Sequence, residues 1–143
     1  YPRAQEGIMP ENYNYDKSDY TVSGDECSKN CIVTYGREFS QCWQAFQQLE
    51  NTCLIKLNKI KPLSDDAVSF AAKSDNVFFF EESVKSGGVG EIFGCRLEIL
   101  GAKVNYRLIA VEDEFIKQAS VCSQLKKYHL DCDSVVKEVK NEQ

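Results

Sequence analysis

Residues 77–90 read VFFFEESVKSGGVG, an apolar run followed by polar residues and a cluster of glycines. The run Val77–Phe80 is short, continuous and aromatic, which favours a strand that is buried on both faces. Beyond the glycines, apolar residues recur with helical spacing until Gly101, where we expect the helix to end. These apolar residues are Ile92, Phe93, Leu97 and Leu100. The stretch therefore predicts a strand, a tight turn and a helix in succession.

The same alternation extends in both directions along the chain. Three further apolar runs predict strands at Cys31–Tyr35, Cys53–Leu57 and Val104–Ile109. Between the first two, residues three and four apart predict an amphipathic helix with the face Phe39, Cys42, Trp43, Phe46 and Leu49. Ser64 is a suitable N-cap for a second helix, which carries Val68, Ala71 and Ala72.

Strands that alternate with helices predict an α/β fold. We expect a three-layer sandwich with a mainly parallel, mixed sheet of about five strands and helices on both faces. After the last strand, the tail predicts two short helices near residues 120–128 and 133–139.

The ends of the chain suggest how the domain is connected. Residues 1–30 are polar and dotted with tyrosines, so we interpret them as a linker from a preceding domain and residues 31–143 as the domain itself. Within the linker, turn-forming residues separate Tyr20–Val22 from Cys31–Tyr35, which predicts a short hairpin. The chain starts at Tyr1 without a Met or an apolar signal segment, which indicates a piece of a longer protein.

Composition excludes several classes of partner. The chain has 143 residues and a formal net charge of -5, opposite to the basic surface that nucleic acids select. Its apolar runs are far shorter than the roughly 20 residues that span a bilayer. We therefore expect neither nucleic acid nor a membrane as a partner.

The seven cysteines bear on the cellular compartment. An odd number leaves at least one thiol unpaired in any disulfide scheme within one chain, which favours a reducing, cytoplasmic location. Four of them lie among apolar neighbours and are expected to be buried free thiols: Cys31, Cys53, Cys95 and Cys122.

The glycine cluster Gly87–Gly90 follows a strand and opens a helix, where backbone N–H groups can hold a phosphate. However, Glu81, Glu82 and Glu91 surround the cluster, and no Lys-Ser/Thr pair follows it as in a P-loop. We therefore favour glycines that allow a tight turn and close packing of helix on sheet.

Other candidate sites are weaker. Cys27, Cys31, His129 and Cys132 are of the types that bind zinc, but their spacing fits loosely, so we favour ordinary reduced cysteines. A Cys122–His129 pair lacks an orienting carboxylate. The acids Glu112–Glu114 are interpreted as a solvated cap at the start of a helix. The residues alone thus predict an α/β domain without an active site of its own.

Taken in order, five segments resemble the C-terminal domain of the transketolase superfamily, and most closely that of its 1-deoxy-D-xylulose-5-phosphate synthase family. Tyr1–Arg3 resembles the stretch that closes the family's middle domain, and Ile60–Ser64 resembles a Lys-Pro-Leu-Asp turn between strand and helix. The other segments resemble the first strand, the Val-Glu-Glu strand end with its Gly-Gly-x-Gly helix start, and the tail. They are Ile32–Gly36, Phe80–Glu82 with Gly87–Gly90, and Glu112–Asp131.

The resemblance implies a structural, dimer-supporting domain of an enzyme that makes a precursor of isoprenoids and thiamine. In that family, thiamine diphosphate and Mg²⁺ bind between the first two domains of a homodimer, and pyruvate is condensed with glyceraldehyde 3-phosphate. The implied partners of this chain are therefore the N-terminal and middle domains of the same enzyme. The chain by itself is expected to bind no cofactor and to be inactive.

Arg3 is the one site residue that the resemblance implies. The matching Arg of the family contacts the phosphate of the aldehyde substrate, a role that suits a guanidinium group. The remaining alternatives are the same domain of another transketolase-type enzyme or of a 2-oxo-acid dehydrogenase beta subunit, and a stand-alone protein-interaction module.

Overall fold

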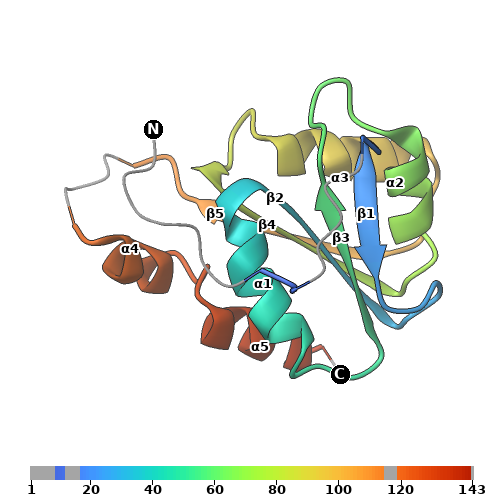
Figure 1. The fold of residues 1–143 in the computed structure, drawn as a ribbon. Coiled ribbons are helices and arrows are strands. Elements are labelled where there is room, and N and C mark those ends of the chain that lie inside the picture. Colours follow the sequence, from blue (N-terminus) through green and yellow to red (C-terminus); the bar gives the residue numbers. More distant parts are fainter. Residues whose placement is uncertain (1–8, 12–16, 115–118, 143) are drawn as a thin grey trace.

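The computed structural model describes residues 9–11, 17–114 and 119–142 (Figure 1). Five strands and five α-helices alternate through most of this part of the chain, with a short 3-10 helix at Gly36–Glu38. The strands are β1 Tyr20–Ser23, β2 Asn30–Tyr35, β3 Thr52–Leu57, β4 Asn76–Val84 and β5 Asn105–Val111. The helices are α1 Phe39–Phe46, α2 Asp65–Ala71, α3 Val89–Ile99, α4 Val121–Lys127 and α5 Cys132–Lys140.

The strands form one mixed sheet in the order β1-β3-β2-β4-β5. Strands β2 to β5 run parallel, and β1 runs antiparallel to β3. The predicted hairpin between the runs at Tyr20–Val22 and Cys31–Tyr35 is wrong, because Tyr20 pairs with Leu57 of β3 instead. The physical reason is that both edges of β2 are already occupied by its parallel neighbours β3 and β4.

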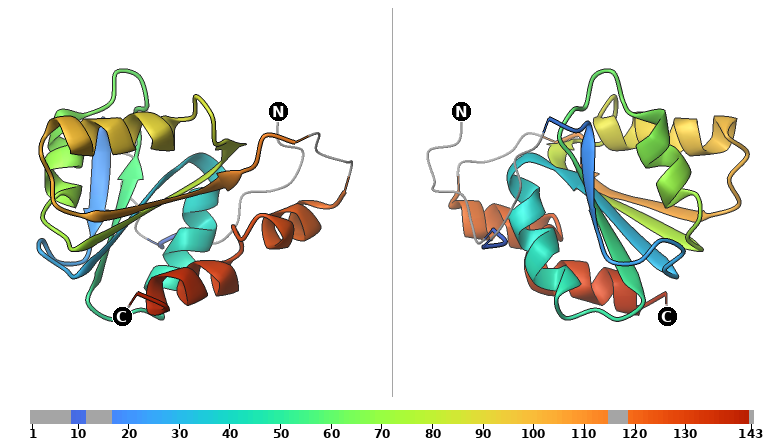
Figure 2. Two further views of the ribbon diagram at one scale, coloured as in Figure 1. Left: turned by 180° about the vertical axis from the view of Figure 1, so that it is seen from behind. Right: turned by 45° about the vertical axis from the view of Figure 1, so that its right-hand side comes forward.

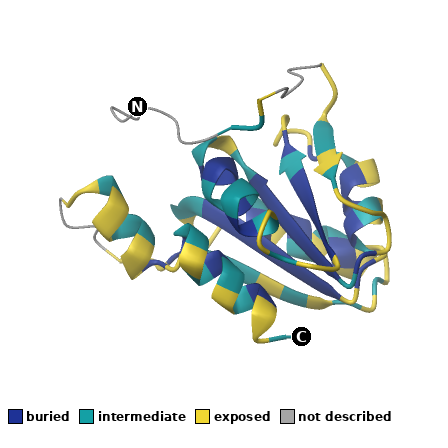
Figure 3. Cartoon of the chain, turned by 60° about the horizontal axis from the view of Figure 1, so that its bottom comes forward, coloured by how far each residue is buried: buried dark blue, intermediate teal, exposed yellow. Residues whose placement is uncertain are grey.

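Helices cover both faces of the sheet and complete three layers, as predicted. Helices α2 and α3 lie on one face, and α1 and α5 lie on the other (Figures 1 and 2). Each face has its own apolar core, and the central strands are buried along most of their length (Figure 3). Helix α4 lies to one side and has no buried residue. The aromatic run predicted from the sequence contributes to both cores, since Phe78, Phe79 and Phe80 are fully buried.

The burial of the cysteines follows the faces of these elements. All seven are free thiols. Cys31, Cys42 and Cys53 are buried, but Cys95 and Cys122 are exposed, contrary to expectation. Cys95 lies on the outer side of α3, whose inner side is occupied by Phe93 and Leu97.

None of the helices in the described ranges is both long and apolar enough to cross a membrane.

Candidate functional site at the carboxyl edge of the sheet

The topology points to the carboxyl ends of β2 and β4 as the place where a ligand would bind. From β2 the chain adds β3 on one side and then β4 on the other. In open α/β sheets, ligands bind outside the carboxyl ends of the strands at such a reversal of strand order. Four polar residues lie there: Tyr35 and Arg37 at and after the end of β2, and Glu81 and Glu82 in β4.

The carboxylate of Glu81 is fully buried and accepts hydrogen bonds from side chains and from the backbone. The hydroxyls of Tyr35 and Ser83 donate to it at 2.8 Å each. The backbone N–H groups of Val89 and Gly90 donate at 3.2 and 3.1 Å. These N–H groups belong to the first turn of α3, where a bound phosphate would otherwise accept them. Glu81 therefore occupies the place that an anion would take.

Strand β4 extends beyond its predicted end. The sequence predicted a strand from the apolar run Val77–Phe80, closed by Glu81 and Glu82, but the strand continues to Val84, which pairs with Val111 after a register shift. A buried carboxylate is tolerated in a strand when hydrogen bonds replace its hydration.

The phenol of Tyr35 is held as a hydrogen-bond donor. Burial, together with the nearby carboxylates of Glu81 and Glu82, raises the pKa of Tyr35 to about 12. The hydroxyl therefore stays protonated at neutral pH and donates a hydrogen bond to Glu81.

Two glycines permit the close approach between this carboxylate and α3. A Cβ at Gly88 would overlap the carboxylate of Glu81 and lie 2.8 Å from the carbonyl oxygen of Val84. A Cβ at Gly90 would overlap Leu108 and lie 2.9 Å from the ring of Phe79. The interpretation of the glycines as a device for close packing of helix on sheet is thus confirmed.

Arg37 and Glu82 form an ion pair near Glu81. The guanidinium donates to both carboxylate oxygens, at 3.1 Å from Nε and 3.0 Å from Nη2, and both side chains are partly buried. The cavity next to this pair, bounded by Tyr128 and Leu130, has a volume of about 110 Å³. Pockets that hold small-molecule ligands measure roughly 300–1,000 Å³, so this cavity does not accommodate a substrate.

Glu38 is the residue here that the sequence analysis missed. Its side chain is buried, and neither carboxylate oxygen has a hydrogen-bond partner among the described residues. Burial, with the charges of Glu82 and Asp131 adding to it and Arg37 opposing it, raises the pKa of Glu38 to about 9. Glu38 precedes Cys42 by four residues, a spacing that places both side chains on the same face of a helix. This spacing is the feature of the sequence that could have indicated its burial.

The structure separates most of the other candidate residues. Glu112 and Glu114 are exposed and bind lysines, Lys85 at 3.4 Å and Lys127 at 2.6 Å, as a solvated acidic segment would. The hydrogen bonds from Lys127 and then Tyr128 lower the pKa of Glu114.

The candidate zinc ligands and the candidate Cys122–His129 pair do not form a site among the described residues. His129 and Cys122 are exposed, and no group of three or more potential metal ligands occurs within the described part of the chain. Arg3 lies outside the described residues.

The described residues do not fit a thiamine diphosphate–Mg²⁺ site. The helix N-terminus at the strand-order reversal is occupied by Glu81 rather than open to a diphosphate. We therefore assign no chemical step to these residues. The hydrogen bonds of Glu81 and the Arg37–Glu82 ion pair instead connect the end of β2, β4 and the start of α3.

Comparisons with known proteins agree with this fold. The family model "Transketolase, C-terminal domain" matches residues 20–135, from the first residue of β1 into α5. A solved structure described as "Split gene transketolase, inactive beta4 tetramer" has a TM-score of 0.78 and 20% sequence identity. The match covers 94% of this chain and 45% of that chain, and it shows a shared fold.

Similar sequences come from longer proteins. The 1-deoxy-D-xylulose-5-phosphate synthase of Caldanaerobacter subterraneus subsp. tengcongensis is 29% identical over 147 residues, covering 94% of this chain and 23% of that enzyme. The same enzyme of Campylobacter hominis is 28% identical over 120 residues, covering 80% of this chain and 19% of that enzyme. The chain thus spans less than a quarter of the length of these curated relatives. The family match over most of the sequence and the shared fold show that this chain belongs to the transketolase C-terminal domain family.

Proposed function

We propose that this chain is the structural C-terminal domain of a thiamine-diphosphate-dependent 1-deoxy-D-xylulose-5-phosphate synthase. The whole enzyme condenses pyruvate with glyceraldehyde 3-phosphate, and its other domains hold thiamine diphosphate and Mg²⁺. One observation supports this structural role of the domain more strongly than the others. The carboxylate of Glu81 occupies the ligand position at the carboxyl edge, so this domain stabilises the enzyme rather than carrying out its chemistry.

The partners in this proposal are the N-terminal and middle domains of the same enzyme, assembled as a cytoplasmic homodimer. The relatives support it because each is several times longer than this chain and carries the matching segment as a small part of its length.

A domain exchange tests the proposal. The Caldanaerobacter enzyme would be truncated to remove the segment that matches this chain, and this chain would be fused in its place. We expect the truncated enzyme and the isolated 143-residue chain to be inactive with pyruvate, glyceraldehyde 3-phosphate, thiamine diphosphate and Mg²⁺. The fusion should regain dimerisation and product formation.

Substrate tests separate this proposal from its alternatives. A ketose phosphate in place of pyruvate as the two-carbon donor probes a transketolase-type enzyme, and a lipoyl domain as the acceptor probes a 2-oxo-acid dehydrogenase beta subunit, each in the complete natural enzyme. Turnover by the isolated chain, or preference of the complete enzyme for the ketose phosphate donor or the lipoyl acceptor, would overturn the proposal.

Arg3 is proposed to bind the phosphate of the aldehyde substrate in the complete enzyme. Replacing Arg3 with Ala should raise the KM for glyceraldehyde 3-phosphate and leave the KM for pyruvate unchanged, because only the first substrate carries a phosphate. Arg3→Lys should recover part of the effect, since a lysine retains the charge but not the bidentate geometry. Equal changes in both KM values would contradict the proposal.

A further inference from the structure

The outer edge of β5 is the open side of the sheet next to α3. Strand β5 is last in the strand order and pairs with β4 on its inner side, and no other described strand pairs with its outer side. An open strand edge presents unpaired N–H and C=O groups that can bind another strand.

The register with β4 determines which backbone groups face outward. The N–H of Asn105 donates to the carbonyl of Asp75 at 2.8 Å. Because backbone groups of a strand point alternately to its two sides, every second residue from Asn105 bonds to β4. The residues between them direct their N–H and C=O groups toward the open edge, and these are Tyr106, Leu108 and Ala110.

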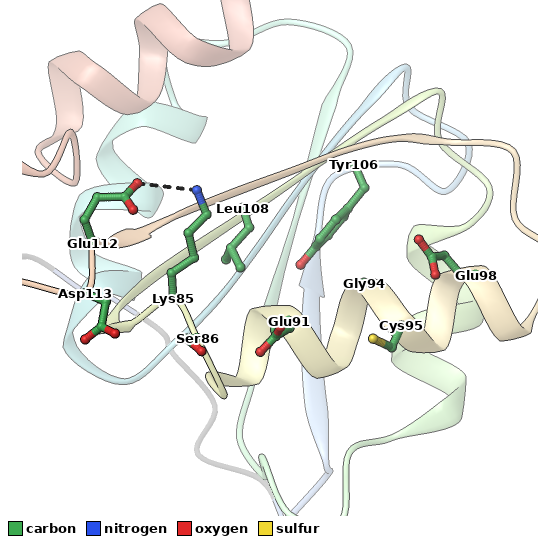
Figure 4. A pocket seen from close by; sticks show the side chains of 10 residues that line it. All are labelled: Lys85, Ser86, Glu91, Gly94, Cys95, Glu98, Tyr106, Leu108, Glu112 and Asp113. Carbon is green, nitrogen blue, oxygen red and sulfur yellow. Dashed lines mark hydrogen bonds and ion pairs between the residues drawn. The ribbon is translucent and has the colours of Figure 1, made fainter.

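Two surface hollows flank this edge, one toward α3 and one toward α4 and α5, and Lys85, Leu108 and Glu112 line both. The hollow toward α3 has a volume of about 500 Å³, and Tyr106 and Leu108 project from β5 toward it (Figure 4). The hollow toward α4 and α5 has a volume of about 390 Å³ and is lined in part by Ile109 and Ala110. Side chains of an added strand alternate between the two faces of a sheet, so every second one would enter the hollow toward α3.

The charge of the two hollows selects the kind of strand that fits. The hollow toward α3 contains four carboxylates and one ammonium group, that of Lys85, which is paired with Glu112 at 3.4 Å. The other three carboxylates belong to Glu91, Glu98 and Asp113. The other hollow holds the carboxylates of Glu112, Glu114 and Glu138 together with the ammonium groups of Lys85 and Lys127. Basic side chains therefore match the first hollow.

We propose that the open edge of β5 binds an extended basic segment of a partner polypeptide as a sixth strand. The segment pairs with the outward N–H and C=O groups of Tyr106, Leu108 and Ala110. It places Lys or Arg at every second position into the acidic hollow beside α3. A second copy of this chain is a poorer occupant, because pairing two β5 edges would bring two acidic hollows together. The inference does not depend on the proposed function.

A peptide titration of the ¹⁵N-labelled 143-residue chain tests this inference. The probe is an acetylated and amidated nonapeptide in which Lys and Val alternate. Two control peptides have Glu in place of Lys, or N-methyl groups on every backbone nitrogen. We expect saturable binding of the Lys peptide only, with amide hydrogen exchange at Leu108 and Ala110 slowed about tenfold or more in the complex.

Paired charge variants locate the binding face. The double substitution Glu98→Lys with Asp113→Lys changes two exposed residues of the acidic hollow and should weaken binding about tenfold. The matched control, Glu50→Lys with Asp25→Lys, makes the same change in net charge at exposed residues outside both hollows and should bind like the original chain.

Three results would overturn the inference. The first is no saturable binding at about 1 mM peptide, the weakest affinity of interest. The second is binding that leaves exchange at Leu108 and Ala110 unchanged, because that indicates attraction of charge without strand pairing. The third is slowed exchange at these amides without peptide that increases with protein concentration, which would assign the edge to a second copy of the chain.

Discussion

Replacing Glu38 with Gln should make the domain more stable at neutral pH. Glu38 is 1% exposed, neither carboxyl oxygen has a hydrogen-bond partner among the described residues, and the charges of Glu82 and Asp131 lie nearby. The pKa of Glu38 is about 9 in the folded chain, against an ordinary value of 4.5. The folded state at neutral pH therefore holds a proton that the unfolded chain releases.

The sign of the pH dependence follows from this difference in pKa. Between pH 4.5 and pH 9 the folded chain binds about one more proton at Glu38 than the unfolded chain does. The free energy of unfolding therefore falls as pH rises through this range, by about 1.4 kcal/mol per pH unit. At pH 7 the loss relative to pH 4.5 is about 3 kcal/mol for this residue. Gln resembles a protonated carboxyl group in shape but does not ionise, so the substitution removes this loss.

Urea unfolding at several pH values measures the effect, with the single tryptophan, Trp43 of α1, as the fluorescent probe. The two chains should be about equally stable near pH 4.5, and the Glu38→Gln variant should be about 3 kcal/mol more stable at pH 7. Glu50→Gln at an exposed carboxyl is the matched control and should change stability little at any pH. The reasoning is refuted if the stability difference between the Glu38→Gln variant and the original chain stays constant from about pH 5 to about pH 8.

The packing around α3 and the burial of the thiols lead to three further predictions. Gly90→Ala should lower the free energy of unfolding by about 1–3 kcal/mol, because the added methyl group overlaps Leu108; a thermal melt with unchanged Tm would contradict the close approach. Glu81→Ala should cost about 2–4 kcal/mol by leaving buried donors of Tyr35 and α3 unpaired, and Glu81→Gln should cost less in urea unfolding because its amide oxygen still accepts. With an aromatic disulfide reagent, native protein should react at four thiols, and the remaining three should react only at the rate of unfolding; early reaction of any of them would contradict their burial. The slow set is Cys31, Cys42 and Cys53.

Much of the fold was predictable because it depends on local patterns. Continuous apolar runs such as Val77–Phe80 indicate strands buried on both faces, and helical spacing between the runs indicates the covering layers. The N-cap at Ser64 is equally local: its hydroxyl accepts from the N–H of Ala67, three residues along the chain. The ordered set of motifs also pointed to the correct family, because it spans most of the chain.

The candidate site was less predictable because its partners come from distant segments. The sequence placed Glu81 at the end of the strand but gave no partner for it, and its donor Tyr35 is 46 residues away. The sequence correctly indicated that carboxylates oppose an anion at the glycine turn, but not that one of them fills the position.

The sequence by itself determined the order of strands and helices, the apolar faces and the close-packing role of the glycines, since each follows from the spacing of neighbouring residues. Only the tertiary structure decided that β1 joins β3, that the buried Glu38 carboxyl lacks a hydrogen-bond partner among the described residues and that Cys95 faces outward. Strand pairing and burial depend on which surfaces remain free once the core has assembled. Which surfaces remain free depends on the whole chain and not on any one segment.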